Sequence, residues 1–288
     1  MKILDGKATS AKVKAEVKER ASALKNAGIE PALAVILVGS DKASQTYVAA
    51  KQKACEASGI RSVMHKLPQT TSQNELLALI NVLNLDDSID GILVQLPLPA
   101  HIDTTSVLET IWPQKDVDGF HAENVGKLVS GLDGFVPCTP LGIMRILKEY
   151  GIDVAGLNAV VIGRSNIVGK PMASLLLNAS ATVTITHSKT RNLKQICSAA
   201  DLIVAAIGKP NFVTADMVKE GAIVIDVGIN RLDDGRLVGD VDFEAVAPKS
   251  SFITPGPGGV GPMTIAMLLS NTIRSAQNRA KNLGIVKE

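Results

Sequence analysis

The sequence of 288 residues is poor in aromatic residues, cysteine and histidine. Aromatic residues make up 3% of the chain, which argues against the stacking platforms on which proteins bind single-stranded nucleic acid. The three cysteines, Cys55, Cys138 and Cys197, lie far apart and form no CxxC pair. This excludes a disulfide framework and fits the reduced thiols of a cytosolic protein. The four histidines are scattered and form no cluster with cysteine, so no metal site is expected.

Charge of one sign is not in excess, and long uncharged helical runs are absent. Thirty basic residues less 28 acidic ones leave a net charge of +2, so we expect no nucleic-acid partner. The uncharged stretch 250–273 holds three prolines and four glycines and cannot span a bilayer, so we expect no membrane partner. Charges recur between Lys2 and Lys25, which argues against a signal peptide and favours a cytoplasmic protein.

Short aliphatic runs alternate with segments of helical periodicity along most of the chain. The runs are continuously apolar, which predicts strands buried on both faces of a parallel sheet. The alternation predicts an α/β fold, and helical patterns cover residues 43–58 and 73–85, for instance. We expect strands at residues 33–39, 61–67, 91–98, 158–163, 181–188, 202–208, 222–229 and 251–255.

The chain is expected to form two domains. A stretch rich in Pro and Gly at 134–142 separates two strand–helix series, and Pro140 suits the first turn of a helix over 141–150. The last helix, from 262 to about 282, follows the final strand and could return to the first domain. We therefore assign residues 1–140, with the C-terminal helix at 262–288, to an N-terminal α/β domain, and residues 141–261 to a second domain.

The segment NAVVIGRSNIVGKP, residues 158–171, is typical of a phosphate-binding turn. An apolar strand leads into Gly163 and Gly169, and a helix is expected over 172–178. The N-terminus of a helix offers free N–H groups and a partial positive charge to a phosphate. The GxGxxG pattern is incomplete, and the lysine after Gly169 is followed by proline, which excludes a P-loop. Glycines that only pack a helix against a strand are the alternative.

Residues around this turn favour NADP over NAD. The strand at 181–188 ends in His187, Ser188, Lys189 and Thr190, whereas a dinucleotide fold that selects NAD usually has an acidic residue there. Arg164 lies in the glycine turn, and a guanidinium beside a hydroxyl suits a 2′-phosphate. The alternative for Arg164 is a solvated turn residue.

Two polar features in the first domain suggest chemistry. Tyr47 and Lys51 are four residues apart, so both project from one helix face, and a lysine can exchange protons if its site lowers its pKa. Gln95 follows the apolar run of residues 91–94, where ligands bind in open α/β sheets. A surface lysine beside a half-buried tyrosine, and an edge-strand contact for Gln95, are the alternatives.

Two further stretches suggest a flat ligand. Asp116 and Asp118 precede a glycine, and one of these carboxylates could hold a ring edge with two adjacent N–H donors. An Asx turn is the alternative. The loop TPGPGGVGPMT, residues 254–264, has enough glycine and proline to let backbone approach a ligand closely.

Taken together, these stretches resemble the bifunctional methylenetetrahydrofolate dehydrogenase/methenyltetrahydrofolate cyclohydrolase family. The resemblance implies oxidation of 5,10-methylenetetrahydrofolate with NADP and then hydrolysis to 10-formyltetrahydrofolate. It also implies a homodimer whose subunits have a Rossmann-like NADP-binding C-terminal domain, with the folate in a cleft between the two domains. The matching segments are SQTYVAAKQKACE, DGILVQLPLP, KDVDGF, PCTPLGI, VVIGRSNIVGKPM, GAIVIDVGINR, GDVDF and TPGPGGVGPMTIAML.

The resemblance assigns roles to individual positions. It implies that Lys51 is the catalytic lysine, with Tyr47 and Gln95 as partners, and that Asp118 holds the pterin. These four also belong to the implied folate site, together with Leu96, Gly261 and Pro262. The implied cofactor residues are Thr139, Gly163, Arg164, Ser165, Gly169, Ser188 and Ile229.

Two other functions are alternatives. A two-domain NADP enzyme of the shikimate dehydrogenase type has the same architecture but no role for KDVDGF or PGPGGVGPMT. A protein that senses NADP and has no catalytic activity would not need these four residues together: Tyr47, Lys51, Gln95 and Asp118.

Overall fold

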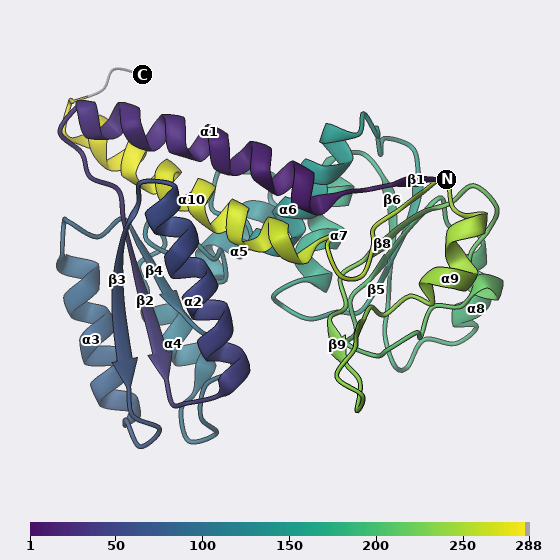
Figure 1. The fold of residues 1–288 in the computed structure, drawn as a ribbon, viewed down its shortest axis with the longest axis horizontal. Helices are drawn as coiled ribbons and strands as arrows, with labels where there is room; N and C mark the ends of the chain where they lie inside the picture. The colour runs from purple at the N-terminus through teal and green to yellow at the C-terminus, as the bar shows by residue number, and fades with distance from the viewer. Residues whose placement is uncertain (286–288) are drawn as a thin grey trace. The chain divides into compact units, whose positions relative to one another are not determined.

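The computed structural model describes residues 1–285 and divides the chain into two compact units (Figure 1). The three-stranded unit comprises Lys12–Lys127, Asp133–Val136 and residues 265–285. The six-stranded unit comprises Met1–Ala11, Leu128–Leu132 and Pro137–Thr264. The long helices α1 (Gly6–Asn26) and α10 (Gly261–Asn282) contribute residues to both units. The two-domain α/β architecture expected from the sequence is therefore confirmed.

The three-stranded unit is built on a parallel sheet in the order β3-β2-β4. β2 (Ala32–Val38) is buried along its whole length between β3 (Arg61–Leu67) and β4 (Gly91–Val94). Its aliphatic side chains pack against those of β4 and α3, among them Ile36, Ile80 and Ile92. Such a sheet exposes its carboxyl ends at one edge, where the loops can hold a ligand.

Local sequence signals determine where the helices of this unit begin. Asp41 accepts a hydrogen bond from the Ser44 amide at the start of α2 (Lys42–Ala57). Ser72 and Glu75 form a reciprocal capping box at the start of α3 (Gln73–Leu85). Each cap satisfies N–H groups that have no partner within the helix. Two shorter helices follow, α4 (Thr104–Thr110) and α5 (Ala122–Val129).

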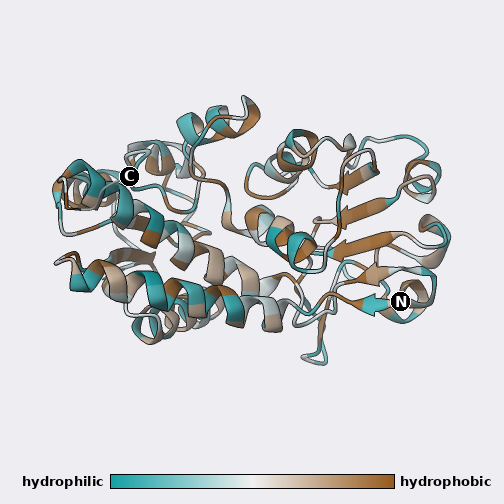
Figure 2. Cartoon of the chain, turned by 90° about the horizontal axis from the view of Figure 1, so that it is seen from above, coloured by the Kyte–Doolittle hydropathy of each residue, from teal (hydrophilic) through white to brown (hydrophobic). Residues whose placement is uncertain are grey.

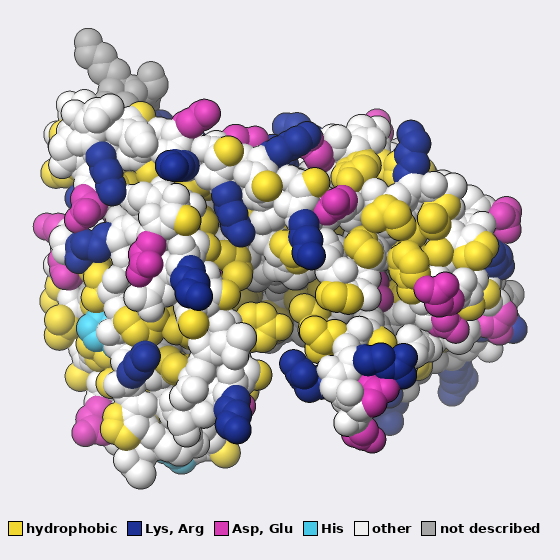
Figure 3. Space-filling view, in the orientation of Figure 1, with side chains coloured by type: hydrophobic (Ala, Val, Ile, Leu, Met, Phe, Trp, Pro, Cys, Tyr) yellow, Lys and Arg dark blue, Asp and Glu magenta, His cyan; other side chains and the backbone are white. Residues whose placement is uncertain are grey.

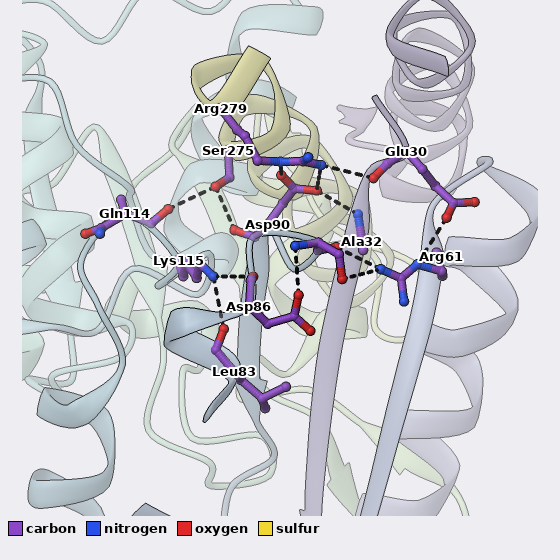
Figure 4. A network of polar contacts seen from close by, with 11 residues as sticks. Glu30, Ala32, Arg61, Leu83, Asp86, Asp90, Gln114, Lys115, Ser275 and Arg279 are labelled. Atoms are coloured by element: carbon purple, nitrogen blue, oxygen red, sulfur yellow. Dashed lines mark hydrogen bonds and ion pairs between the residues drawn. The ribbon is translucent and has the colours of Figure 1, made fainter. Parts of the chain in front are cut away.

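A buried ion pair attaches α10 to the amino-terminal edge of this sheet (Figure 4). Asp90, just before β4, accepts hydrogen bonds from Arg279 Nε at 2.7 Å and Nη2 at 3.1 Å. The Ala32 amide donates to the same carboxylate at 2.8 Å. Ser275 Oγ donates to the backbone oxygen of Asp90 at 2.6 Å and lies within 2.9 Å of that of Gln114. One carboxylate thus joins the C-terminal helix to two adjacent strands.

The six-stranded unit is a parallel sheet in the order β1-β11-β8-β7-β5-β6. Its central strands are coloured hydrophobic in Figure 2, and β7 and β8 are buried along their whole length. The strands are β1 (Lys2–Ile3), β5 (Asn158–Ile162), β6 (Thr182–Thr186), β7 (Leu202–Ala205), β8 (Ile223–Asp226) and β11 (Phe252–Ile253). The helices are α6 (Cys138–Glu149), α7 (Gly169–Asn178), α8 (Leu193–Ser198) and α9 (Phe243–Val246), with 3-10 turns at Ala215–Met217 and Ala247–Lys249.

The structure corrects several expectations about the strands. β3 and β6 are edge strands and keep partly exposed side chains, whereas β4, also at an edge of its sheet, is buried along its whole length. Most strands end earlier than their apolar runs; β4, for instance, stops at Val94, and not at residue 98. The sequence analysis missed β1 and the antiparallel hairpin of β9 (Asn230–Arg231) and β10 (Leu237–Val238), since both are too short to show a pattern.

Charged side chains of both signs are interspersed over the face drawn in Figure 3. The strip of α1 that crosses this face carries lysines, but acidic side chains lie among them. Within residues 1–285, no helix combines the length and the apolar character that crossing a bilayer requires.

Candidate active site

A lysine and a glutamine meet at the carboxyl end of β4. Lys51, on α2, is 9% exposed, and its Nζ donates to Gln95 Oε1 at 3.0 Å. Gln95 is held in turn by its backbone amide, which donates to Ile36 O at 2.9 Å, and by its Nε2, which donates to Leu96 O at 2.7 Å. The pairing excludes the alternative that Lys51 is a solvated surface lysine. A buried amine with a fixed partner can present its remaining protons in one direction.

The other residues expected beside Lys51 lie in the same unit. Tyr47 lies one helical turn before Lys51 and is 46% exposed, so part of its side chain is accessible to a ligand. Leu96 is half-buried directly after Gln95. Asp118 is half-buried on the loop that follows Asp116.

The buried carboxylate of Asp116 holds this loop in place. It is 2% exposed and accepts hydrogen bonds from the backbone amides of Gly119, Phe120 and His121 at 3.1, 3.2 and 2.9 Å. Asn124 Nδ2 adds a fourth at 2.9 Å. Burial raises the pKa of Asp116 to about 6, although these donors oppose the shift. Of the two aspartates, Asp116 therefore forms the Asx-type turn, and Asp118 keeps the exposure that a ligand contact needs.

The six-stranded unit contains a cavity of about 500 Å³ at the carboxyl ends of its central strands. Gly163 follows the last residue of β5 with φ +118°, and a Cβ there would lie 2.3 Å from Ala206 O. A Cβ on Gly169, the first residue of α7, would lie 2.2 Å from Gly163 O. Both positions therefore require glycine, because the turn folds back on itself at the N-terminus of the helix. The expected helix start at residue 172 is corrected to Gly169.

The lining of this cavity suits an anion. Arg164, Ser188 and Lys209 line it, and no acidic residue does. Arg164 and Ser188 are exposed, so their donors are free to meet a phosphate. Ser165 is used differently, since its Oγ accepts from the Val168 and Gly169 amides at 3.2 Å and so braces the turn. The cavity is lined by Ile162, Gly163, Arg164, Thr186, His187, Ser188, Thr190, Leu193, Ala206, Ile207, Lys209 and Phe212.

A second group of expected residues gathers elsewhere in the six-stranded unit. Thr139, in the first turn of α6, shares a hydrogen bond of 2.8 Å with Thr264 Oγ1. Gly261 begins α10, and a Cβ there would lie 3.2 Å from Ile229 Cδ1. Pro262 follows, and its backbone oxygen accepts from Ser10 Oγ at 3.0 Å. The structure thus places Thr139, Ile229, Gly261 and Pro262 around the start of α10.

The sequence analysis did not identify some residues around the cavity. Ile207 and Lys209 lie in the loop after β7 and line it. Asp240 is fully buried behind the same loop. The sequence does hold a signal for Ile207 and Lys209. The segment IGKP, residues 207–210, follows an apolar run, and loops at the carboxyl ends of parallel strands bind ligands. Within residues 1–285, no group of three or more His, Cys, Asp and Glu side chains could hold a metal ion.

Two family models match the chain. Residues 4–118 match the catalytic domain of tetrahydrofolate dehydrogenase/cyclohydrolase. Residues 137–280 match the NAD(P)-binding domain of the same family.

Individual relatives extend over nearly the whole chain. The bifunctional protein FolD of Campylobacter concisus is 79% identical over 98% of this chain and 100% of its own length. The crystal structure of the bifunctional FolD of Campylobacter jejuni is 62% identical with a TM-score of 0.96, covering 97% of this chain and 99% of that one. The Trypanosoma brucei enzyme, solved with NADP cofactor and an inhibitor, is 40% identical with a TM-score of 0.92, covering 96% and 97%. The chain described here belongs to the tetrahydrofolate dehydrogenase/cyclohydrolase family.

Proposed function

We propose that this chain oxidises 5,10-methylenetetrahydrofolate with NADP and hydrolyses the resulting methenyl compound to 10-formyltetrahydrofolate, as a bifunctional enzyme of one-carbon metabolism. The observation that carries the proposal is the buried pair of Lys51 and Gln95 at the carboxyl end of β4. It supplies a proton-carrying group of the kind that the hydrolytic step needs. The NAD(P)-binding domain over residues 137–280 supports the oxidative step.

The oxidative step needs alignment more than acid–base catalysis. The reacting carbon lies between two nitrogens, and their lone pairs stabilise the amidinium cation that forms when a hydride leaves. NADP, when bound, accepts that hydride. The chain has only to hold the two ligands in register, which by itself can lower a barrier substantially. This is consistent with a site that lacks the His–Asp pair of other dehydrogenases.

The hydrolytic step needs proton transfer. Water must lose a proton as it attacks the methenyl carbon, and a ring nitrogen must gain one for the ring to open. We assign these proton transfers to Lys51, and Gln95 would orient the Nζ of Lys51 through the 3.0 Å hydrogen bond. Tyr47, one turn away on α2, would shape the site with its exposed ring. A positioned acid or base typically contributes about 10²–10⁴-fold to a rate.

The folate would be held mainly by the three-stranded unit. Asp118 is assigned to the pterin edge, whose adjacent N–H donors match a carboxylate. Leu96, after Gln95, would pack on the ligand. Gly261 and Pro262, at the start of α10, are assigned to the loop that covers the folate.

The cavity of the six-stranded unit would hold NADP. Three features of the cavity suit the phosphates of NADP. They are the tight turn at Gly163 and Gly169, the N-terminus of α7, and the side chains of Arg164 and Lys209 in a lining that has no acidic residue. Arg164 and Ser188 are assigned to the 2′-phosphate. Ser165 would support cofactor binding indirectly, because its hydroxyl holds the glycine turn in place. Thr139 and Ile229 are assigned to the nicotinamide end of the cofactor.

We also propose a homodimer in the cytoplasm, with no nucleic-acid partner. β6 is an edge strand with an exposed Ile185, and such an edge offers unpaired backbone groups to a second chain. Sedimentation at micromolar concentration tests this assembly. We also propose a folate domain and an NADP domain close to the division expected from the sequence, residues 1–140 with 262–288 and residues 141–261. The compact units place Met1–Ala11 and residues 137–140 with the six-stranded sheet, and residues 286–288 lie outside the described part of the chain.

A mixture of the protein, methylenetetrahydrofolate and NADP tests the activity directly. Absorbance from reduced cofactor should grow with time, and 10-formyltetrahydrofolate should accumulate as the final product. No growth with either NADP or NAD would contradict the dehydrogenase assignment.

Replacing Arg164 with alanine should weaken NADP selectively. The variant loses the guanidinium expected to pair with the 2′-phosphate, and a charge-assisted pair of this kind contributes about 1.5–3 kcal/mol, or about 10- to 100-fold in affinity. The measurement is binding of NADP and NAD to wild type and variant by fluorescence titration. Equal loss of both cofactors, or no loss of NADP, would remove Arg164 from cofactor selection.

Replacing Asp118 with alanine should weaken folate binding and leave NADP binding unchanged. The pterin loses the acceptor for its adjacent N–H donors, so we expect the KM for methylenetetrahydrofolate to rise about 10-fold or more. KM values for both ligands provide the measurement. Parallel damage to folate and NADP binding would indicate misfolding and contradict a ligand role.

A further inference from the structure

The carboxylate of Asp240 is buried behind one wall of the NADP cavity and is fully used by backbone and side-chain donors. It is 0% exposed. Its Oδ2 accepts from the Ile207 and Gly208 amides at 2.7 and 3.0 Å. Its Oδ1 accepts from the Lys209 amide and from Asn230 Nδ2, both at 2.9 Å. Four donors therefore converge on one side chain.

These donors come from two loops that the proposed cofactor site uses. Ile207 and Lys209 follow β7 and line the cavity. Asn230 directly follows Ile229, which is assigned to the nicotinamide end. A charged acceptor organises three consecutive amides more strongly than neutral groups do. The carboxylate of Asp240 thus joins the wall of the cavity to the segment after β8.

Asp240 is itself held from the end of β8. Asp226 is 6% exposed, and its carboxylate accepts from the backbone amides of Asp240 and Val241 at 2.8 and 2.9 Å. The approach is so close that a Cβ on Gly239 would lie 1.7 Å from Asp226 Oδ2, and one on Gly228 would lie 2.2 Å from Asp240 Oδ1. Only glycine at positions 228 and 239 leaves space for these two carboxylates. The position of the Asp240 carboxylate therefore depends on Asp226, Gly228 and Gly239 together.

We propose that Asp240 is a positioning residue for the dehydrogenase reaction: it sets the shape of the NADP cavity by fixing the backbone of residues 207–209 and the amide of Asn230. The inference rests on the placement of NADP in this cavity. It assigns no contact between Asp240 and the cofactor. Loss of this carboxylate should therefore change cofactor affinity and spare the hydrolytic step, which needs no NADP.

The test is the Asp240→Asn substitution, which keeps the volume but replaces one acceptor oxygen with a donor that faces N–H groups. We expect the KM for NADP to rise about 10-fold or more, with kcat at saturating NADP within about twofold of wild type. Hydrolysis of methenyltetrahydrofolate, assayed without NADP, should stay unchanged. Asp242→Asn is the matched control, because that carboxylate caps α9 through the Ala245 amide and does not line the cavity.

The possible outcomes are distinct. An unchanged KM for NADP in Asp240→Asn, or an equal fall of both activities, would overturn the inference. If Asp240→Asn does not fold, the Asn230→Ala variant tests the inference, because it removes one donor and leaves the carboxylate in place. The KM for NADP should then rise several-fold. An unchanged KM would overturn the inference. If wild type bound no NADP, the proposed function would fail and the inference with it, and that result is visible before any variant is made.

Discussion

Replacing Lys51 with methionine should abolish the cyclohydrolase activity and leave hydride transfer largely intact. Methionine retains much of the length and the apolar stem of lysine but carries no proton, and the Gln95 amide loses its 3.0 Å partner. We expect the hydrolysis of methenyltetrahydrofolate to fall by about 10²–10⁴-fold, the usual contribution of a positioned acid or base. Oxidation of methylenetetrahydrofolate should then stop at the methenyl compound, whose accumulation can be followed by its absorbance.

The same helix offers a matched control. Lys53 lies two residues further along α2 and is exposed, so Lys53→Met removes an identical charge from the opposite side of the helix. Both activities of this variant should stay near wild type. Full cyclohydrolase rate in Lys51→Met would remove Lys51 from the mechanism. Equal loss of both activities would instead indicate damage to folate binding.

Replacing Asp90 with alanine should have the largest effect on stability. The side chain of Asp90 is 0% exposed and pairs with Arg279 through both carboxylate oxygens. The variant leaves the Arg279 guanidinium without its partner and the Ala32 amide without its acceptor. Removing one member of a buried ion pair typically costs about 3–5 kcal/mol, so we expect a loss of that size in the free energy of unfolding of the three-stranded unit. Denaturant titration followed by circular dichroism measures it.

Two comparisons sharpen this test. Asp87→Ala removes an exposed carboxylate three residues earlier and should change the free energy of unfolding by no more than about 0.5 kcal/mol. The double variant Asp90→Leu/Arg279→Met removes both charges and should recover part of the loss, because no buried charge is then left unpaired. A cost below about 1 kcal/mol for Asp90→Ala would show that the pair is not important for stability.

The predictions from sequence were strongest where local pattern decides structure. The run at residues 61–67 matches β3, and the segment of helical periodicity at 73–85 matches α3, whose N-terminus also has a capping box. The tight turn between β5 and α7 was expected from two glycines that follow an apolar run. In the structure both glycines lie where a Cβ would collide with backbone oxygen atoms.

The site was harder to predict, because its contacts join residues distant in sequence. The hydrogen bond between Lys51 and Gln95 spans 44 residues, and the Asp90–Arg279 pair spans 189. The choice between Asp116 and Asp118 was also open, since either could form an Asx turn. The structure decides it by burying Asp116 among four donors. Asp240 had no visible signal beyond its place in the segment GDVDF.

The sequence by itself determined the α/β class, the glycine turn after β5 and the residue types available for chemistry. Each of these depends on neighbours along the chain, where periodicity, capping and turn conformation act. Only the tertiary structure decided which carboxylates are buried as supports, which strands lie at the edges, and which amine has a fixed partner. Those properties depend on burial and on hydrogen bonds between distant segments, which arise only when the chain is folded.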